Sequence, residues 1–156
     1  MNHLMLETMI KSCIPLLGLL AFASTAPAVE KRPPNVVLIV TDDGGWADFG
    51  FNGCKDYPTP HMDSIAREGV NFTAGYVSAP VCSPSRAGLL AGRNQSCFGH
   101  EYNIIGHRSQ GLPLSEILLS QRFKDLGYAT AAYGKWHLGG GKGHQPFERG
   151  FDESYG

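Results

Sequence analysis

A cysteine set between two prolines is the residue of this sequence best placed to do chemistry. Cys82 lies between Pro80 and Pro84, which stiffen its loop. A helix is expected just after it, over 85–90, and the N–H groups at the start of a helix favour negative charge. Arg86 follows four residues after the cysteine, about one helical turn away, so its guanidinium can face the same oxyanion. These residue types indicate an anion site, although an isolated cysteine is more often a small buried hydrophobe.

Two adjacent carboxylates form a second candidate centre. Asp42 and Asp43 directly follow the apolar run at 35–40. Adjacent negative charges repel each other, so burying both of them invites a cation. Carboxylate oxygens are hard ligands that favour Ca²⁺ or Mg²⁺ over softer metals. The alternative is a capped and solvated turn, and the pair by itself does not decide between the two.

A lysine and a histidine form the third candidate group. Lys135 and His137 follow an apolar segment at 128–133 that is expected to be a strand. At the end of a strand, residues two apart point to the same side. Both side chains can then reach one cleft while Trp136 turns to the core. The alternative is a strand end that carries only solvated charge.

Longer strings around these residues resemble motifs of the sulfatase family. Cys-Ser-Pro-Ser-Arg at 82–86, continued to Gly92-Arg93, resembles the family's maturation motif, C-x-P-x-R with a T-G-R-like ending. The stretch 42–50 is similar to the family's amino-terminal motif, and 127–139 closely resembles its second motif. The three motifs occur in the family's order and cover nearly all of the chain beyond its first segment.

The resemblance implies a modified nucleophile and a metal. In the sulfatase family a dedicated formylglycine-generating or sulfatase-maturating enzyme oxidises the motif cysteine to formylglycine, and that enzyme is therefore an expected partner. By resemblance, Cys82 becomes formylglycine, and its oxygen ligates a divalent metal together with Asp42 and Asp43. Calcium is the expected ion, ahead of magnesium.

The resemblance also implies roles for the basic residues and a reaction. Arg86 stabilises the hydrated aldehyde, Lys135 contacts the sulfate and formylglycine oxygens, and His137 hydrogen-bonds the formylglycine hydroxyl. One hydroxyl of the hydrate attacks the sulfur of a sulfate ester, and the alcohol departs. The second hydroxyl then loses its proton, to His137, and sulfate is expelled as the aldehyde reforms. The expected substrate is a small-molecule or carbohydrate sulfate ester, and the expected activity is arylsulfatase-like.

Alternation of strands and helices predicts the fold class. Strands are expected at 35–40, 70–77 and 128–133. Helices are expected from Thr59-Pro60 to Gly69 and over 113–126, in addition to the one near Cys82. This order predicts an α/β sandwich with a mostly parallel sheet. The resemblance implies an alkaline-phosphatase-like form of it, incomplete because we expect the chain to be truncated.

The amino-terminal segment is typical of an export signal. Residues 1–28 contain a lysine, a short apolar run at 14–23 and small residues at 26–28 that fit a cleavage site. The run is shorter than the roughly 20 residues of a membrane span, so no stable membrane insertion is expected after its removal. Residues 29–34 then form a charged, proline-rich linker, and 35–156 the amino-terminal part of a sulfatase catalytic domain. The expected location is the periplasm or the outside of the cell.

Composition narrows the function classes. A net charge of −1 gives no support for nucleic-acid binding, which requires a basic patch or stripe. The hydrophobic fraction of 42% is ordinary for a globular domain. Cys54 and Cys97 can form a disulfide only if the fold brings them together, and the sequence leaves that open.

Length raises the main alternatives. Sulfatases are several times longer than this chain, and their later metal ligands, a further lysine and a further histidine have no counterpart in it. We therefore expect an amino-terminal portion that cannot complete turnover alone. A non-catalytic sulfatase remnant is one alternative. A phosphatase or phosphonate hydrolase of the same superfamily is another, but those enzymes typically offer Ser or Thr as the nucleophile, and a purely structural or binding role has no positive support.

The modification of Cys82 can be measured directly. Conversion of its thiol to an aldehyde lowers the mass of the peptide that contains it, and mass spectrometry of a digest reports the change. We expect the lowered mass when the protein is produced in a host that makes formylglycine. An unmodified thiol from such a host counts against the sulfatase interpretation and favours the phosphatase alternative.

Overall fold

The structure is a computed structural model, and it describes residues 32–105 and 111–156. The predicted signal peptide at 1–28 and the first residues of the predicted linker lie outside the described residues. The chain divides into two compact units, 1–39 and 40–156. All the candidate site residues belong to the second unit.

The apolar run at 35–40 is not a strand. No helix or strand occurs in residues 32–40, and Val37 and Ile39 are 82% and 72% exposed. The prediction of a buried central strand there is wrong for the described structure. A strand needs a neighbour to take up its backbone N–H and C=O groups, and no described segment pairs with this one.

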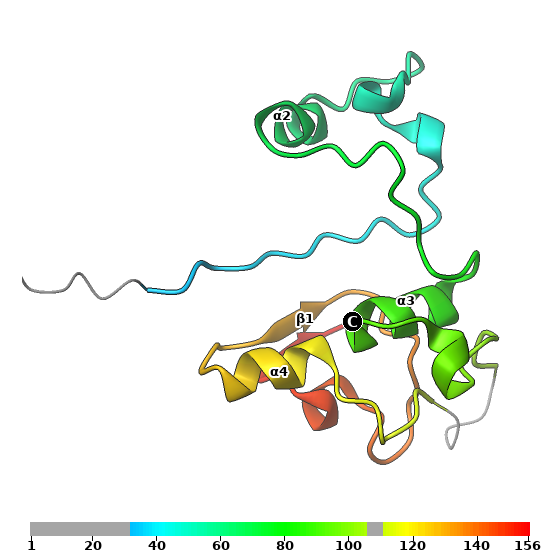
Figure 1. Cartoon of the computed structure of the whole chain (residues 1–156), viewed down its shortest axis with the longest axis vertical. Coiled ribbons are helices and arrows are strands. Elements are labelled where there is room, and N and C mark those ends of the chain that lie inside the picture. Colours follow the sequence, from blue (N-terminus) through cyan, green and yellow to red (C-terminus); the bar gives the residue numbers. More distant parts are fainter. Residues whose placement is uncertain (1–31, 106–110) are drawn as a thin grey trace, which may run out of the picture. The chain divides into compact units, whose positions relative to one another are not determined.

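The second unit consists mainly of short helices and turns (Figure 1). Its elements are, in chain order, the 3₁₀-helices η1 (Trp46–Asp48) and η2 (Gly50–Asn52), the α-helices α2 (Pro60–Glu68) and α3 (Cys82–Ala91), the 3₁₀-helix η3 (Gln95–Phe98), the α-helix α4 (Leu119–Asp125), the strand β1 (Ala131–Tyr133), the 3₁₀-helix η4 (Pro146–Arg149) and the strand β2 (Glu153–Tyr155). No helix among the described residues is long and apolar enough to cross a membrane.

Helix α2 has the boundaries that its sequence predicts. Proline occupies its first position, where the missing N–H costs nothing, and Gly69 ends it. The Thr59 hydroxyl donates to the Asp63 carboxylate at 2.9 Å. The same carboxylate accepts from the Phe51 N–H at 2.8 Å. Asp63 therefore fastens α2 to η2.

Helix α3 begins at the cysteine itself, three residues earlier than predicted. Val81 is its N-cap residue and Cys82 its first helical residue. Pro84 is tolerated inside the first turn because N–H groups there have no helical acceptor. Gly92 ends the helix in the left-handed region at φ 68°, which suits glycine. Cys82 thus lies at the amino-terminal, electropositive end of α3.

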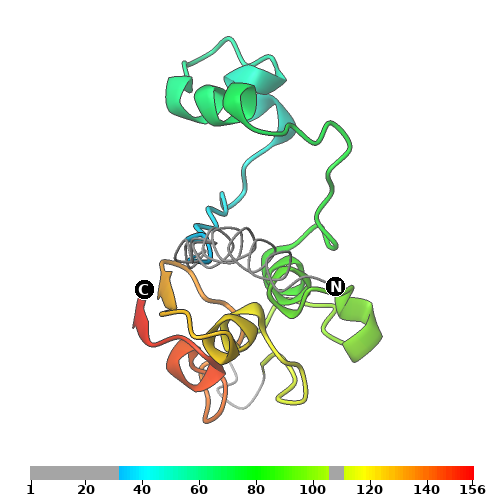
Figure 2. The same ribbon diagram turned by 60° about the vertical axis from the view of Figure 1, so that its left-hand side comes forward.

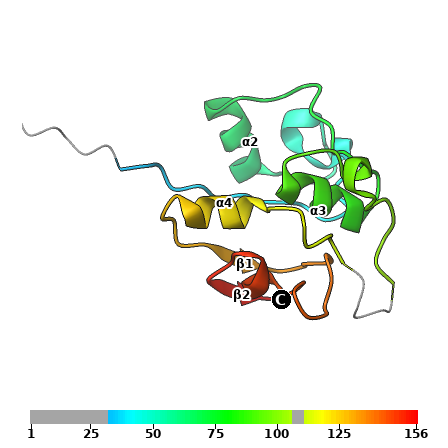
Figure 3. The same ribbon diagram turned by 60° about the horizontal axis from the view of Figure 1, so that its bottom comes forward.

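Strands β1 and β2 form a two-stranded parallel sheet with Ala131 opposite Glu153 (Figures 2 and 3). The strand expected at 128–133 is confirmed over its second half. Periodicity does not predict β2, because three residues are too short to show alternation. The strand expected at 70–77 is wrong: the segment has no regular structure, and Phe72 and Tyr76 are 76% and 91% exposed.

Helix α4 is shorter than the helix predicted over 113–126. Arg149 is 3% exposed and donates to the carbonyls of Leu112 at 3.1 Å and Glu116 at 2.8 Å. A third bond from Arg149 reaches the Pro113 carbonyl at 3.4 Å. These carbonyls face the guanidinium, so the segment before α4 forms turns and the helix starts at Leu119.

A small apolar core joins α3 to the segments before α4 and after β1. Its fully buried members are Ala87, Leu112, Leu118 and Leu138. Trp136 packs against this cluster, as predicted. The Leu112 N–H donates to the Leu138 carbonyl at 2.9 Å. The core therefore fixes the segment after β1, which carries Lys135 and His137, beside the start of α4.

A pair of leucine substitutions tests this core. Leu118→Ala should lower the free energy of unfolding by about 2–5 kcal/mol, since it empties a fully buried site. Leu114→Ala is the matched control because Leu114 is 60% exposed, and its effect should stay within about 0.5 kcal/mol. Urea unfolding of both variants measures the difference, and equal losses would contradict the described core.

Candidate functional site

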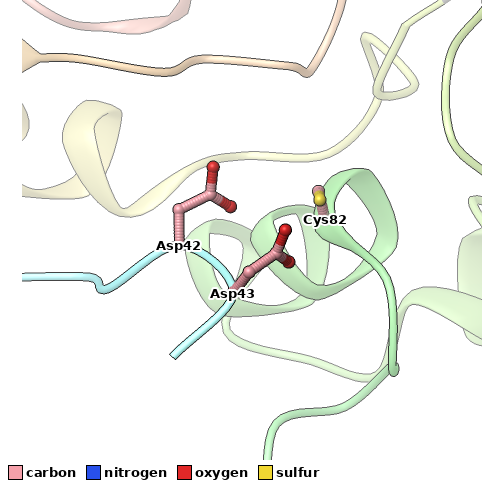
Figure 4. A group of neighbouring side chains, drawn as sticks. All are labelled: Asp42, Asp43 and Cys82. Atoms are coloured by element: carbon pink, nitrogen blue, oxygen red, sulfur yellow. The ribbon is translucent and has the colours of Figure 1, made fainter. Parts of the chain in front are cut away.

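Asp42, Asp43 and Cys82 come together in the structure. One carboxylate oxygen from each aspartate and the Cys82 sulfur lie within 4.8 Å of one another (Figure 4). The aspartates follow the apolar run, whereas the cysteine begins α3. Asp43 has φ 52°, in the left-handed region, which aspartate tolerates better than most residues. The sequence-predicted carboxylate pair and nucleophile therefore share one centre.

Two cations from other segments neutralise Asp42. The Lys135 ammonium donates to its carboxylate at 2.8 Å, and the Arg86 guanidinium lies 3.6 Å from its other oxygen. The hydrogen bond from Lys135 is the main cause that holds the pKa of Asp42 below its ordinary value. The same bond raises the pKa of Lys135, and an interaction with Cys82 raises it further. The lysine therefore stays charged beside both Asp42 and Cys82.

Arg86 links two of these segments. Its guanidinium also donates to the main-chain carbonyl of Lys135 at 2.6 Å. The side chain of Arg86 is only 17% exposed. The predicted placement of Arg86 one helical turn after Cys82 is thus matched by contacts that hold its charge at the same centre.

His137 is placed by its backbone rather than by a strand. β1 ends at Tyr133, and His137 has φ 57°, so strand alternation does not orient it. Its carbonyl accepts from the Ser83 hydroxyl at 2.6 Å. Its ring Nε2 lies 3.3 Å from the Ile104 carbonyl oxygen. Its Nδ1 is buried and has no hydrogen-bond partner among the described residues.

Three further polar residues lie next to the predicted site. The Ser83 hydroxyl lies 2.7 Å from His100 Nε2, and the Ser83 N–H donates to the Asn103 side chain at 2.9 Å. Spacing does not reveal these partners, because they come from segments far apart in sequence.

Cys54 and Cys97, whose pairing the sequence leaves open, are both free thiols in the structure.

The ligand atoms of Asp42, Asp43 and Cys82 fit a hard divalent cation only in part. Two carboxylates are suitable ligands for Ca²⁺ or Mg²⁺, and Ca²⁺ takes about six to eight oxygens. The thiol of Cys82 is a soft ligand that matches such an ion poorly. An oxygen at position 82 in place of the sulfur would bring the donor set into agreement with a hard cation.

The sulfatase family model matches residues 34–156. The chain belongs to the sulfatase family. It is 42% identical over 149 residues to N-acetylgalactosamine-6-sulfatase of Mus musculus, which covers 90% of this chain and 27% of that protein. It is 43% identical over 147 residues to steryl-sulfatase of the same organism, which covers 86% of this chain and 24% of that protein. The chain thus spans about a quarter of the length of these sulfatases.

A solved structure carries the same fold. The crystal structure of Ps i-CgsB in complex with k-i-k-neocarrahexaose matches with a TM-score of 0.77 and 43% identity, over 80% of this chain and 28% of that chain. The predicted α/β, alkaline-phosphatase-like fold class is confirmed by this match, and the described part of our sulfatase chain contributes helices and a small parallel sheet.

Melting temperature measures whether the acidic residues bind a metal. Calcium should raise the melting temperature relative to a chelator by about 5–10 degrees, because binding at about 100 times the Kd adds about 2.7 kcal/mol. Asp42→Asn and Asp43→Asn should abolish the shift. Asp56→Asn, at an exposed aspartate outside the group, should keep it. An equal shift in all three variants would place the ion elsewhere.

Proposed function

We propose that this chain provides the nucleophile and part of the metal centre of a sulfuric ester hydrolase that uses formylglycine at position 82. Membership of the sulfatase family supports the reaction class. The observation that carries the proposal is the approach of the Asp42, Asp43 and Cys82 ligand atoms to within 4.8 Å. A nucleophile and a cation can act on one tetrahedral anion only if they share such a centre.

Position 82 suits an anionic reaction centre. Formylglycine supplies a hydrated aldehyde, of which one hydroxyl attacks sulfur while the other provides a route for release of sulfate. Because residue 82 is the first residue of α3, it lies at the positive end of the helix dipole, which favours the negative charge of a sulfate ester. The helix therefore orients the reacting group and adds to the stabilisation of charge.

The charges at the centre complement the substrate. Asp42 and Asp43 contribute two negative charges, and Arg86 and Lys135 contribute two positive ones. A divalent cation held by the aspartates leaves the centre with a net positive charge. Such fixed charges stabilise the charge that develops on the non-bridging oxygens of a sulfate ester.

His137 is the candidate for proton transfer. Its Nδ1 has no partner among the described residues, and the nitrogen is buried. A neutral imidazole nitrogen in that state can take a proton from a hydroxyl that approaches it. In the proposed cycle it takes the proton of the hydroxyl that expels sulfate.

We extend the proposal to the substrate and the partners. N-acetylgalactosamine-6-sulfatase and Ps i-CgsB with its bound neocarrahexaose are both similar to this chain, and a sulfated carbohydrate is the substrate we propose. Steryl-sulfatase is equally similar, so a steryl sulfate is the alternative substrate. Calcium is the proposed ion because both aspartates offer hard oxygens. A formylglycine-generating enzyme is the proposed maturation partner, and export to the periplasm or the medium follows from the signal-like segment at 1–28.

Two separate cysteine substitutions test the proposed function. In the protein expressed from its complete gene with a maturation enzyme, Cys82→Ala should lower hydrolysis of a sulfate ester by more than about a thousandfold, as expected when a nucleophile is lost. Cys97→Ala changes an exposed free thiol and should leave the rate unchanged. The assay measures release of inorganic sulfate from an aryl sulfate and from sulfated oligosaccharides.

A phosphate ester serves as the competing substrate in the same assay. Faster hydrolysis of the phosphate ester, in protein whose Cys82 is unmodified, would replace the proposal with a phosphatase. Equal sulfate release by the parent protein and the Cys82→Ala variant would remove residue 82 from the reaction altogether.

A further inference from the structure

A buried polar pair lies directly behind the nucleophile, and the proposed reaction does not use it. Ser83 is fully buried, and His100 is 7% exposed. The Ser83 hydroxyl oxygen lies 2.7 Å from His100 Nε2 and 2.6 Å from the main-chain carbonyl oxygen of His137. Buried polar groups are costly unless they are hydrogen-bonded. The two contacts of the Ser83 hydroxyl, which we call the bridge, must therefore satisfy the hydroxyl, the His100 ring nitrogen and the His137 carbonyl at once.

The direction of each hydrogen bond follows from counting protons. A carbonyl oxygen can only accept, so the single proton of the Ser83 hydroxyl points to the His137 carbonyl. The hydroxyl oxygen must then accept from His100, whose Nε2 therefore carries the hydrogen. Burial lowers the pKa of His100, which agrees with a neutral ring of that tautomer.

The bridge ends on a backbone that needs support. His137 and Asp43 are the two residues other than glycine with positive φ in the described part of the chain, and both are candidate site residues. Aspartate and histidine enter the left-handed region more readily than most residues, but this conformation still costs more free energy than the right-handed one, so surrounding contacts help to hold it. The Ser83 hydroxyl holds the His137 carbonyl, and the fully buried Leu138 anchors the next residue.

The segment 100–104 closes around the same two residues. Besides the bond from His100, the Asn103 side chain accepts from the Ser83 N–H at 2.9 Å. The Ile104 carbonyl oxygen lies 3.3 Å from His137 Nε2. Val81, the N-cap residue of α3, offers no side-chain bond to the helix, so Asn103 serves this end of α3 in its place.

We propose that Ser83 and His100 are positioning residues that hold His137 in its left-handed conformation against the amino-terminal end of α3. The hydroxyl of Ser83 connects the residue next to the nucleophile with the main chain of the proton-transfer histidine. His100 keeps that hydroxyl oriented by donating to it. The catalytic consequence rests on the proposed sulfatase function, whereas the hydrogen-bond bridge itself does not.

Kinetics of the protein expressed from its complete gene separate positioning from simple stabilisation. Ser83→Ala and His100→Ala should each lower kcat by at least about tenfold, a change that corresponds to a lost buried hydrogen bond. KM should change by less than about twofold, because Arg86 and Lys135 keep their charges. Each rate is divided by the formylglycine content measured by mass spectrometry, since Ser83 lies inside the maturation motif.

Conservative and matched variants complete the kinetic test. His100→Gln retains an N–H donor and should recover most of the rate, and Ser83→Ala combined with His100→Ala should be no slower than Ser83→Ala alone. Ser115→Ala and His61→Ala, both at exposed residues, should match the parent. A normal kcat with a lowered melting temperature in Ser83→Ala would overturn the positioning role and leave a purely structural one.

NMR of the histidine rings tests the Ser83–His100 hydrogen bond independently of enzyme activity. Long-range ¹⁵N–¹H correlation of the histidine rings should show His100 with its hydrogen on Nε2 near neutral pH, and Ser83→Ala should shift that Nε2 signal. A hydrogen on Nδ1, or a charged ring, would overturn the bridge. An inactive parent protein with the expected His100 signal would instead refute the proposed function and leave the bridge in place.

Discussion

The site depends on the neutralisation of Asp42. Two adjacent carboxylates close to a nucleophile repel one another and any anionic substrate. Lys135 and Arg86 reach Asp42 from two other segments, at 2.8 Å and 3.6 Å, and Arg86 also holds the Lys135 carbonyl. These contacts assemble the acidic turn, the start of α3 and the segment after β1 into one centre. Because Asp42 is exposed, its ion pairs contribute little to the free energy of folding. Their main effect is to fix where the charged groups lie.

The apolar core and the residues with positive φ also help to position the side chains of the site. The buried core includes Leu112, Leu118 and Leu138, and it anchors the segments next to the site residues. Arg149 bonds the main-chain carbonyls before α4 and so limits the length of that helix. Positive φ values occur at Asp43 and His137, where they turn the chain toward Cys82 and Ser83. Strain at such positions is typical of functional sites, where neighbouring contacts hold it.

Local chemistry predicts part of this fold and long-range pairing decides the rest. The ends of α2 follow from Pro60 and Gly69, and a helix beginning at Cys82 is close to what the sequence indicates. The strand expected at 35–40 fails because a strand exists only with a partner, and β2 is too short for periodicity to reveal. The motifs select Asp42, Asp43 and Cys82 as candidates, since each string carries its own residue types, and the structure brings the three together. Ser83 and His137 lie 54 positions apart, and no spacing rule connects them.

We propose that residue 82 and the two aspartates act on one ion and one anion. A crystal structure of the mature protein, expressed from its complete gene and soaked with calcium, tests it most directly through the anomalous signal of the ion. Calcium should lie at about 2.3–2.6 Å from oxygens of Asp42, Asp43 and the modified residue 82. Calcium bound elsewhere, with the side chain of residue 82 turned away from both carboxylates, would contradict it.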